Sequence, residues 1–242
     1  VGAVPVWSTP FRRARRGVMV ATAARVGPAD EVVEKVVAII TRGSGAETEI
    51  LVFRHGFSGM QLPAGTVERG EPVDAALLRE VREETGLQAV VVDRKLALLD
   101  ERLPPSDLMV TDWVEPLTAP HQGAARAEGT VRRGMGFRCW EERNGFARIA
   151  YRQGDMASGD GGDDQVQAWI STTAVSRRIR RHIYHLYPAE DTPARWLVKD
   201  AEAELSLDFH VYWTLLWSAL GLHPIQDGWL RAGLAALETV QR

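Results

Sequence analysis

One amphipathic helix constrains this chain more than any other feature of its sequence. Pro72 stands where the first turn of a helix tolerates proline, and residues 73–85 are rich in good helix formers. Gly86 follows them and is a natural C-cap. The sequence therefore predicts a helix from Pro72 to Thr85.

The predicted helix carries carboxylates along the edge of its apolar face. At about 100° per residue, Glu80 and Glu84 fall within about 20° of Val73 on the helical wheel. Leu77 and Val81 lie next to them, so these two carboxylates border the surface that faces the protein interior. An uncompensated charge there would be costly, and we expect a positively charged group to meet them.

Two kinds of positive group fit this pattern. Glu80, Glu83 and Glu84 stand at i, i+3 and i+4, and we expect them to converge on one point. Their hard oxygen atoms suit magnesium, calcium or manganese. Alternatively, Glu83 pairs with Arg79 across one helical turn and the acidic edge is solvated. Spacing within the helix leaves both alternatives open.

The residues before the helix favour the metal. Gly65 is followed by five residues and Glu71, and then by seven residues and the run from Arg79 to Leu87. This arrangement resembles the complete Nudix box, with every defining position filled. The strand-like segment 49–55 and the Leu62-Pro63-Ala64-Gly65 segment also look like that family.

The resemblance implies a fold and a reaction. The fold is an α+β or α/β Nudix fold, in which a mixed β-sheet lies between helices. The reaction is cleavage of the pyrophosphate bond in a nucleoside diphosphate linked to another group, with Mg²⁺ as the usual metal and Mn²⁺ as an alternative. A different class of function is a non-catalytic Nudix-like sensor or regulator. Such domains tend to lose carboxylates from the box, whereas this chain retains them all.

The resemblance also assigns metal ligands. Glu80 and Glu84 would ligate the metal, and Glu83 would ligate it or act as a base. The carbonyl group of Gly65 would complete the coordination sphere.

Three further assignments follow from the same resemblance. Arg79 would orient a glutamate and belongs, with Glu83 and Glu84, to the implied catalytic set. Glu71 would fix the loop against the helix, and Gly86 would be a structural part of the motif.

The rest of the chain predicts strands with few helices, which favours a layered domain containing both. Runs rich in Val and Ile, separated by turn residues, predict the strands, and Asn144-Gly145 is a strong hairpin signal. Strands are expected at residues 32–40, 49–54, 88–92, 96–99, 107–114, 137–143, 146–152, 177–187 and 207–216, a loop at 56–70, and a closing helix at 227–241.

Domain organisation is predicted from the same pattern. Residues 1–30 are basic and interrupted by proline, and we interpret them as an N-terminal extension. Residues 31–242 would form a single Nudix domain. Residues 104–176 would be an insertion atypical of the family, with an aspartate-rich loop at residues 154–164.

Composition excludes several classes of protein. The longest uncharged apolar run, residues 211–222, is shorter than the roughly 20 residues of a membrane-spanning helix. The net charge of −3 gives no global attraction for nucleic acid. Cys139 is the single cysteine, so no intrachain disulfide can form and a cytoplasmic location is expected. The sequence leaves open whether the chain forms a homodimer.

Substrate choice is the least determined property. Pro63-Ala64-Gly65 looks like ADP-ribose and nucleotide-sugar hydrolases, and the alternative substrates are nucleoside triphosphates or dinucleoside polyphosphates. Arg54 could contact a phosphate, or could be a charged strand end. Arg180 and His182 share one strand face and could bind an anionic ligand, or could form a solvated face.

Overall fold

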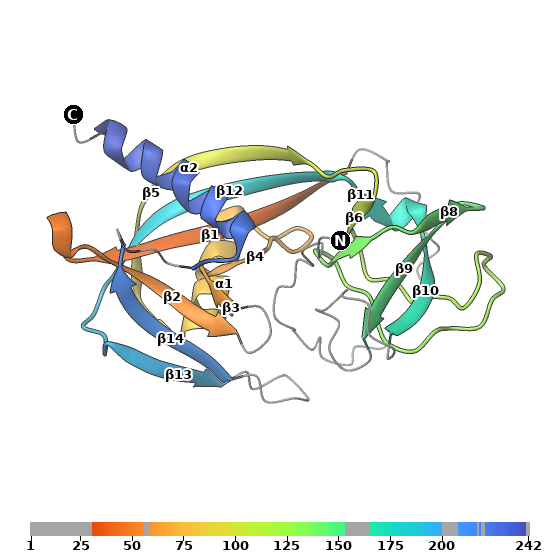
Figure 1. Cartoon of the computed structure of the whole chain (residues 1–242), viewed down its shortest axis with the longest axis horizontal. Helices are drawn as coiled ribbons and strands as arrows, with labels where there is room; N and C mark the ends of the chain where they lie inside the picture. The colour runs from red at the N-terminus through yellow and green to blue at the C-terminus, as the bar shows by residue number, and fades with distance from the viewer. Residues whose placement is uncertain are drawn as a thin grey trace. The chain divides into compact units, whose positions relative to one another are not determined.

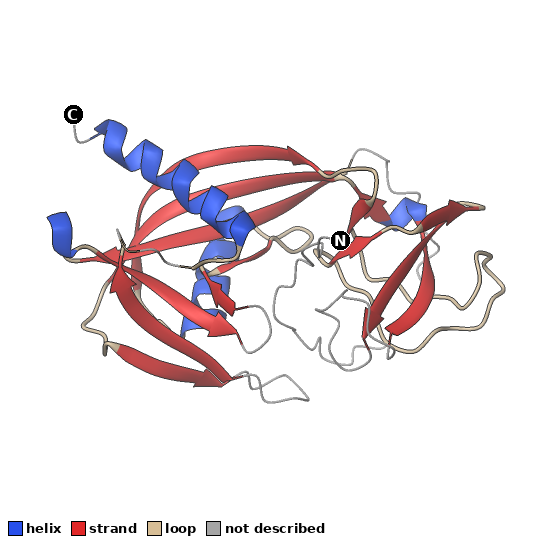
Figure 2. Ribbon diagram, viewed as in Figure 1, coloured by secondary structure: helices blue, strands red, loops and turns tan. Residues whose placement is uncertain are grey.

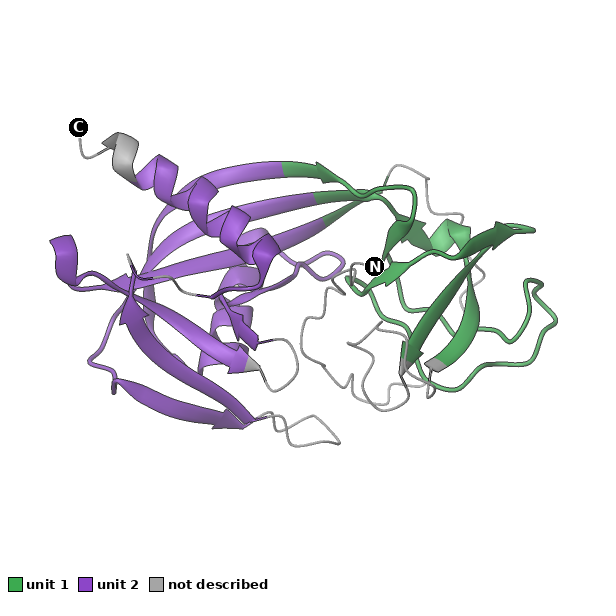
Figure 3. Cartoon of the chain, in the orientation of Figure 1, with its two compact units in different colours: residues 1–33, 100–179 green, residues 34–99, 180–242 purple. Residues whose placement is uncertain are grey.

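The computed structural model describes residues 31–55, 59–152, 165–199, 208–216, 218 and 221–240. The predicted N-terminal extension and the aspartate-rich loop lie outside these residues. The chain divides into two compact units (Figure 3). Unit 1 contains the chain up to Val33 and Asp100–Ile179, and unit 2 contains Glu34–Leu99 and Arg180–Arg242.

Unit 2 is built on an eight-stranded sheet with the order β13-β14-β2-β1-β12-β5, in which β3 pairs with β2 and β4 pairs with β1 (Figure 1). Its strands are β1 (Val32–Arg42), β2 (Glu49–His55), β3 (Gly59–Gln61), β4 (Ala64–Thr66), β5 (Val90–Arg102), β12 (Arg178–Pro188), β13 (Arg195–Lys199) and β14 (Asp208–Leu215). The short 3₁₀ helix η1 (Gly45–Glu47) joins β1 to β2.

Helix α1 (Val73–Thr85) packs on one face of this sheet. Leu77 and Val81 of α1 join Val36 and Ala38 of β1 in one buried cluster. The predicted limits are confirmed within one residue, because Pro72 is the extended N-cap. Gly86 ends the helix with φ +73°, a left-handed conformation that glycine adopts without strain.

Helix α2 (Pro224–Val240) covers the opposite face (Figure 2). Because side chains alternate along a strand, Ile39 of β1 points away from α1. It lies against Gly233 of α2, together with Ile183 of β12. The guanidinium group of Arg181 lies 3.7 Å from the ring centroid of Trp229, which adds a buried contact between β12 and α2. A sheet with a helix on each face confirms the predicted α+β fold class.

One expectation about unit 2 was incomplete and another was wrong. The segment 56–70, predicted to be mainly loop, also contains β3 and β4, which are too short to show hydrophobic periodicity and exist because they pair with β2 and β1. The two predicted strands at 88–92 and 96–99 are one strand, β5. Its polar centre is tolerated because Asp93 and Lys95 bond to His185 and His182 of the neighbouring strand.

Unit 1 holds two three-stranded sheets around a separate buried cluster. The first has the order β10-β9-β8 and the second the order β11-β6-β7. The elements are β6 (Asp107–Val110), β7 (Gly136–Arg138), β8 (Glu141–Arg143), β9 (Phe146–Arg152), β10 (Gln165–Ser171), η2 (Thr172–Ala174) and β11 (Val175–Ser176). Most of the residues of the predicted insertion lie in this unit.

The predicted hairpin exists in a shorter form. β8 and β9 pair around Asn144 and Gly145, which both have positive φ. Residues 136–138 pair with β6 instead, so the strand predicted at 137–143 is divided between two sheets. Among the described helices, none is long and apolar enough to cross a membrane.

Candidate active site

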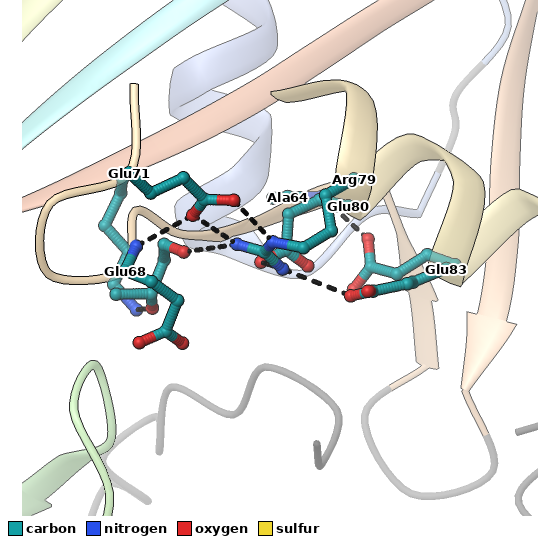
Figure 4. Close-up of polar contacts among 9 residues, drawn as sticks. Ala64, Glu68, Glu71, Arg79, Glu80 and Glu83 are labelled. Carbon is teal, nitrogen blue, oxygen red and sulfur yellow. Dashed lines mark hydrogen bonds and ion pairs between the residues drawn. The ribbon is translucent and has the colours of Figure 1, made fainter. Parts of the chain in front are cut away.

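Arg79, in the middle of α1, is the centre of a polar cluster that joins the helix to the preceding loop. Its guanidinium group donates to the carboxylates of Glu71 (2.8 and 3.0 Å), Glu80 (2.7 Å) and Glu83 (3.1 Å). It also donates to the backbone carbonyl of Thr66 at 2.9 Å. Figure 4 shows Arg79 between Glu71 on the loop and Glu83 on the helix. We call Arg79, Glu71, Glu80 and Glu83 the Arg79 cluster.

Glu71 ties the loop before the helix to the helix itself. Its carboxylate accepts the backbone N–H of Glu68 at 2.9 Å while it holds Arg79. The residues from Thr66 to Glu71 are therefore braced from both sides. This is the loop-fixing position that the Nudix resemblance implied for Glu71.

Two glutamates of α1 are buried, as the helical wheel predicted. Glu80 is 8% exposed and Glu84 is 1% exposed. Burial raises the pKa of Glu80 to about 7, although the charge of Arg79 opposes the shift. Burial and the charge of Glu80 raise the pKa of Glu84 well above its ordinary value, against a hydrogen bond from the backbone N–H of Ala64.

Arg79 stays charged within this group. Its burial alone would lower its pKa, but hydrogen bonds and charge from Glu71 and Glu80 raise the pKa above its ordinary value. One guanidinium group nevertheless faces several carboxylates. Burial is the largest cause of the raised pKa values of Glu80 and Glu84, and the charge of Arg79 opposes it only in part.

Gly65 lies directly against Glu80. A Cβ atom on Gly65 would lie 1.9 Å from the carboxyl carbon of Glu80, far inside van der Waals contact. Any larger residue at position 65 would displace that carboxylate. Gly65 is held there because β4 pairs with β1, with Gly65 opposite Val36.

The predicted convergence of three carboxylates on one point is not observed. Among the described residues, no group of three or more His, Cys, Asp or Glu side chains is placed to hold a metal ion. The reason is local, because Arg79 holds Glu80 and Glu83 while the N–H of Ala64 holds Glu84 at 2.8 Å. The predicted ligands are adjacent but divided between two donors.

The chemistry of this donor set fits a divalent cation. Glu80, Glu83 and Glu84 supply hard carboxylate oxygens, and burial of two of them leaves a demand for positive charge. Gly65 lets the Glu80 carboxylate lie directly against its backbone, where the side chain of any other residue would intrude. Glu83 is the most exposed of the three glutamates, at 30% of its side chain, so it is the one that can meet solvent and substrate.

A second polar cluster lies on the same face of the sheet. The Lys95 ammonium group lies 2.6 Å from Nδ1 of His182, and Nε2 of His182 contacts the Glu34 carboxylate. Arg180 contacts the same carboxylate at 3.5 Å. We call Glu34, Lys95, Arg180 and His182 the His182 cluster. His182 is only 8% exposed, so the alternative of a solvated face is wrong for this residue.

These contacts separate the predicted substrate-binding residues. Both ring nitrogens of His182 are engaged, so a ligand would have to displace Glu34 or Lys95 to bind it. The side chain of Arg180 is 35% exposed. Arg54 is exposed at the end of β2, opposite His210 of β14, and is not brought together with Arg180 by any described contact.

Sequence reasoning missed two contributors to this region. The backbone N–H of Ala64 holds Glu84, and a backbone donor leaves no signal in residue type. Lys35 is 6% exposed and donates to the hydroxyl group of Thr66 at 2.8 Å, and its charge lowers the pKa of Glu80 slightly. A lysine in the middle of an apolar strand was the available signal for it.

Comparison with known families identifies the domain. The NUDIX domain model matches residues 33–131. The matched residues make up less than half of the 242-residue chain. The match contains the whole Nudix box and α1, and it extends beyond residue 104 into the predicted insertion.

This chain is also similar to individual proteins. It is 42% identical over 60 residues to the Caenorhabditis elegans protein named "Putative nudix hydrolase 1". That alignment covers 23% of this chain and spans 16% of the other protein's length. The crystal structure of C. elegans Ap4A hydrolase is similar with a TM-score of 0.36 and 12% identity, over 88% of this chain and 100% of that one. A likeness at that level says nothing of substrate.

Proposed function

We propose that this chain is a divalent-metal-dependent hydrolase that cleaves the pyrophosphate bond of a nucleoside diphosphate linked to another moiety. The observation that carries the proposal is the burial of Glu80 and Glu84 beside Glu83, with more negative charge than Arg79 offsets. The match of residues 33–131 to the NUDIX domain model supports it.

In this proposal Glu80, Glu83 and Glu84 hold Mg²⁺, or Mn²⁺ in its place, with the Gly65 carbonyl as a further ligand. Bound there, the cation supplies charge that offsets the diphosphate and activates water for attack on phosphorus. Glu83 is the group placed to take a proton, because its side chain is the most exposed of the three.

The other members of the site position these glutamates. Arg79 holds Glu80 and Glu83 at fixed places on the helix and is itself held by Glu71 and the carbonyl of Thr66. The N–H of Ala64 fixes Glu84. Such preorganisation reduces the rearrangement that the reaction requires.

Substrate contacts are proposed for Arg54, which is exposed, and Arg180, which is partly exposed, because a guanidinium group can bind a phosphate in two hydrogen bonds. His182 is left out, because both its ring nitrogens have partners. ADP-ribose or a nucleotide sugar is the first proposal for the substrate, on the Pro63-Ala64-Gly65 sequence. The cytoplasmic location and the homodimer stay predictions.

Product analysis tests the proposal. The protein is incubated with Mg²⁺ and a panel of ADP-ribose, nucleotide sugars, nucleoside triphosphates and dinucleoside polyphosphates, and products are identified by mass spectrometry. Phosphate-bearing products that disappear in Glu84→Gln are expected, and their masses name the substrate class. Ligand binding without any turnover across the panel would instead indicate a sensor or regulator.

A further inference from the structure

The start of α2 is attached to the segment that leads into the Nudix box. Leu222 forms an isolated bridge with Met60 of β3, and the N–H of His223 donates to the carbonyl of Met60 at 3.4 Å. One turn further on, Oε1 of Gln226 accepts the backbone N–H of Leu62, with an N···O distance of 2.6 Å. Each of these contacts joins the C-terminal part of the chain to residues 60–62.

The Gln226 contact is buried and specific. Gln226 is 8% exposed and Leu62 is fully buried. Leu62 lies just after β3. Its backbone N–H donates to the side chain of Gln226, which is 164 residues away along the chain. A buried backbone N–H that loses its acceptor is costly, so the acceptor at position 226 holds the backbone of Leu62 in place.

The segment that begins at Leu62 reaches the glutamates within three residues. The carbonyl of Pro63 accepts the N–H of Ala38 at 2.8 Å, which attaches the segment to β1. The N–H of Ala64 donates to Glu84 at 2.8 Å, and Gly65 lies against the carboxylate of Glu80. A shift of this backbone therefore moves the donor of one buried glutamate and the wall beside the other.

We propose that Gln226 is a positioning residue of the metal site. It acts from the helix on the opposite face of the sheet, through the Leu62 N–H, and fixes the segment 62–65 that holds Glu84 and borders Glu80. Gln226 has no described contact with the glutamates themselves. The inference rests on the proposed function, because it assigns a role in the same site.

Three variants separate positioning from stability. Gln226→Met keeps the length of the side chain and removes the acceptor, and Gln226→Glu keeps an acceptor oxygen. Trp229→Leu weakens the packing of α2 on Arg181, one turn away, without touching Leu62. The full chain is used throughout, with Mn²⁺ affinity measured by electron paramagnetic resonance. Hydrogen exchange is measured at residues 62 and 64, and kcat and KM are measured on the substrate found in the panel.

Gln226→Met is expected to weaken Mn²⁺ binding by about tenfold, in the range seen when groups that orient metal ligands are removed. Exchange at Leu62 and Ala64 should accelerate, and kcat should fall about tenfold with KM nearly unchanged. Gln226→Glu should recover most of the Mn²⁺ affinity. Trp229→Leu should lower Tm while Mn²⁺ affinity and kcat stay within about threefold of wild type.

Wild-type Mn²⁺ affinity and Leu62 exchange in Gln226→Met would overturn the positioning role. Equal losses of Mn²⁺ affinity in Gln226→Met and Trp229→Leu would overturn it too, because α2 would then act only through stability. A wild-type chain that binds Mn²⁺ and hydrolyses nothing contradicts the proposed function alone, since Mn²⁺ affinity and exchange still decide the role of Gln226.

Discussion

The Arg79 cluster and the His182 cluster lie on the same face of the sheet, but they balance charge differently. In the Arg79 cluster, Glu71, Glu80 and Glu83 contact one guanidinium group, and Glu84 lies beside them. In the His182 cluster, the carboxylate of Glu34 meets both Arg180 and a histidine that accepts from Lys95.

This difference indicates which cluster can attract a cation. The described contacts of the Arg79 cluster leave a surplus of negative charge, and the pKa values of Glu80 and Glu84 are raised accordingly. The described contacts of the His182 cluster leave no such surplus. Under the proposed function, the metal site is the cluster whose buried acids outnumber their cations, whereas the partly exposed Glu34 is already paired with cationic partners.

The largest effect is expected from a substitution of Glu84, the most buried acid beside the Arg79 cluster. Glu84→Gln keeps the shape of the side chain and removes a charged ligand, so Mg²⁺-dependent turnover should fall by about a hundredfold or more. The matched control is Glu49→Gln, which removes a carboxylate bound to Arg42 at 2.6 Å outside the site. Rates measured on the panel substrate should fall only in Glu84→Gln, and equal rates in both variants would contradict the site.

A second substitution tests whether metal binding requires glycine beside Glu80. Gly65→Ala places a Cβ atom where the carboxyl group of Glu80 lies, so Mn²⁺ affinity should fall by about tenfold or more. Gly228→Ala is the control, because a Cβ atom at that position of α2 meets nothing within 4 Å. It should stabilise the protein by about 0.4–1 kcal/mol in urea unfolding. Full Mn²⁺ affinity in Gly65→Ala would show that metal binding does not require the missing side chain at position 65.

Magnesium should stabilise the protein through Glu80, Glu83 and Glu84 alone. A cation that binds only the folded state adds about 2.7 kcal/mol at 100 times its Kd. At about 2–4 °C per kcal/mol for a chain of this size, Tm should rise by several degrees. Calorimetry should find the increase in wild type and in Glu34→Gln, which alters the His182 cluster. Its persistence in Glu84→Gln would place the bound cation elsewhere.

The sequence predicted the local part of this arrangement. The limits of α1 and the inward edge of Glu80 and Glu84 depend on neighbouring residues and helical periodicity. The roles of Ala64 and Gln226 could not be predicted, because a backbone N–H and a distant amide meet only after the sheet has formed. Similarly, the polar centre of β5 suggested a break between two strands, and its partners on β12 are distant in sequence.

A smaller effect is expected at the exposed edge of the His182 cluster. If Arg180 contacts the substrate, Arg180→Ala should raise KM severalfold and leave kcat nearly unchanged. Arg231→Ala, which removes an exposed arginine paired with Asp227 on α2, provides the comparison. Steady-state kinetics of both variants give the KM and kcat values for this comparison. An unchanged KM in Arg180→Ala would leave Arg180 with a structural role beside Glu34.

The smallest effect concerns an exposed pair outside both clusters. Hydrogen bonds from Arg94 and His185 lower the pKa of Asp93 below its ordinary value. A lowered carboxyl pKa adds stability above the unfolded-state pKa of about 3.9, and this contribution is lost as pH falls through the folded-state pKa. Urea unfolding between pH 6 and pH 3 should show Asp93→Asn losing less stability than wild type, by under about 1 kcal/mol.

The division of unit 2 into two stretches of chain also determines the order in which it can be made. Helix α1 leaves the ribosome long before β12, whose Tyr184 holds Asp74 of α1, and β14, whose Phe209 packs in the same core. At ordinary rates of synthesis, the chain between α1 and β12 takes roughly 5–20 s to appear. During that interval Leu77 and Val81 have no completed core to enter. A nascent chain stalled before β12 should therefore present α1 to chaperones, and the core that α1 enters is complete only after β14 has been synthesised.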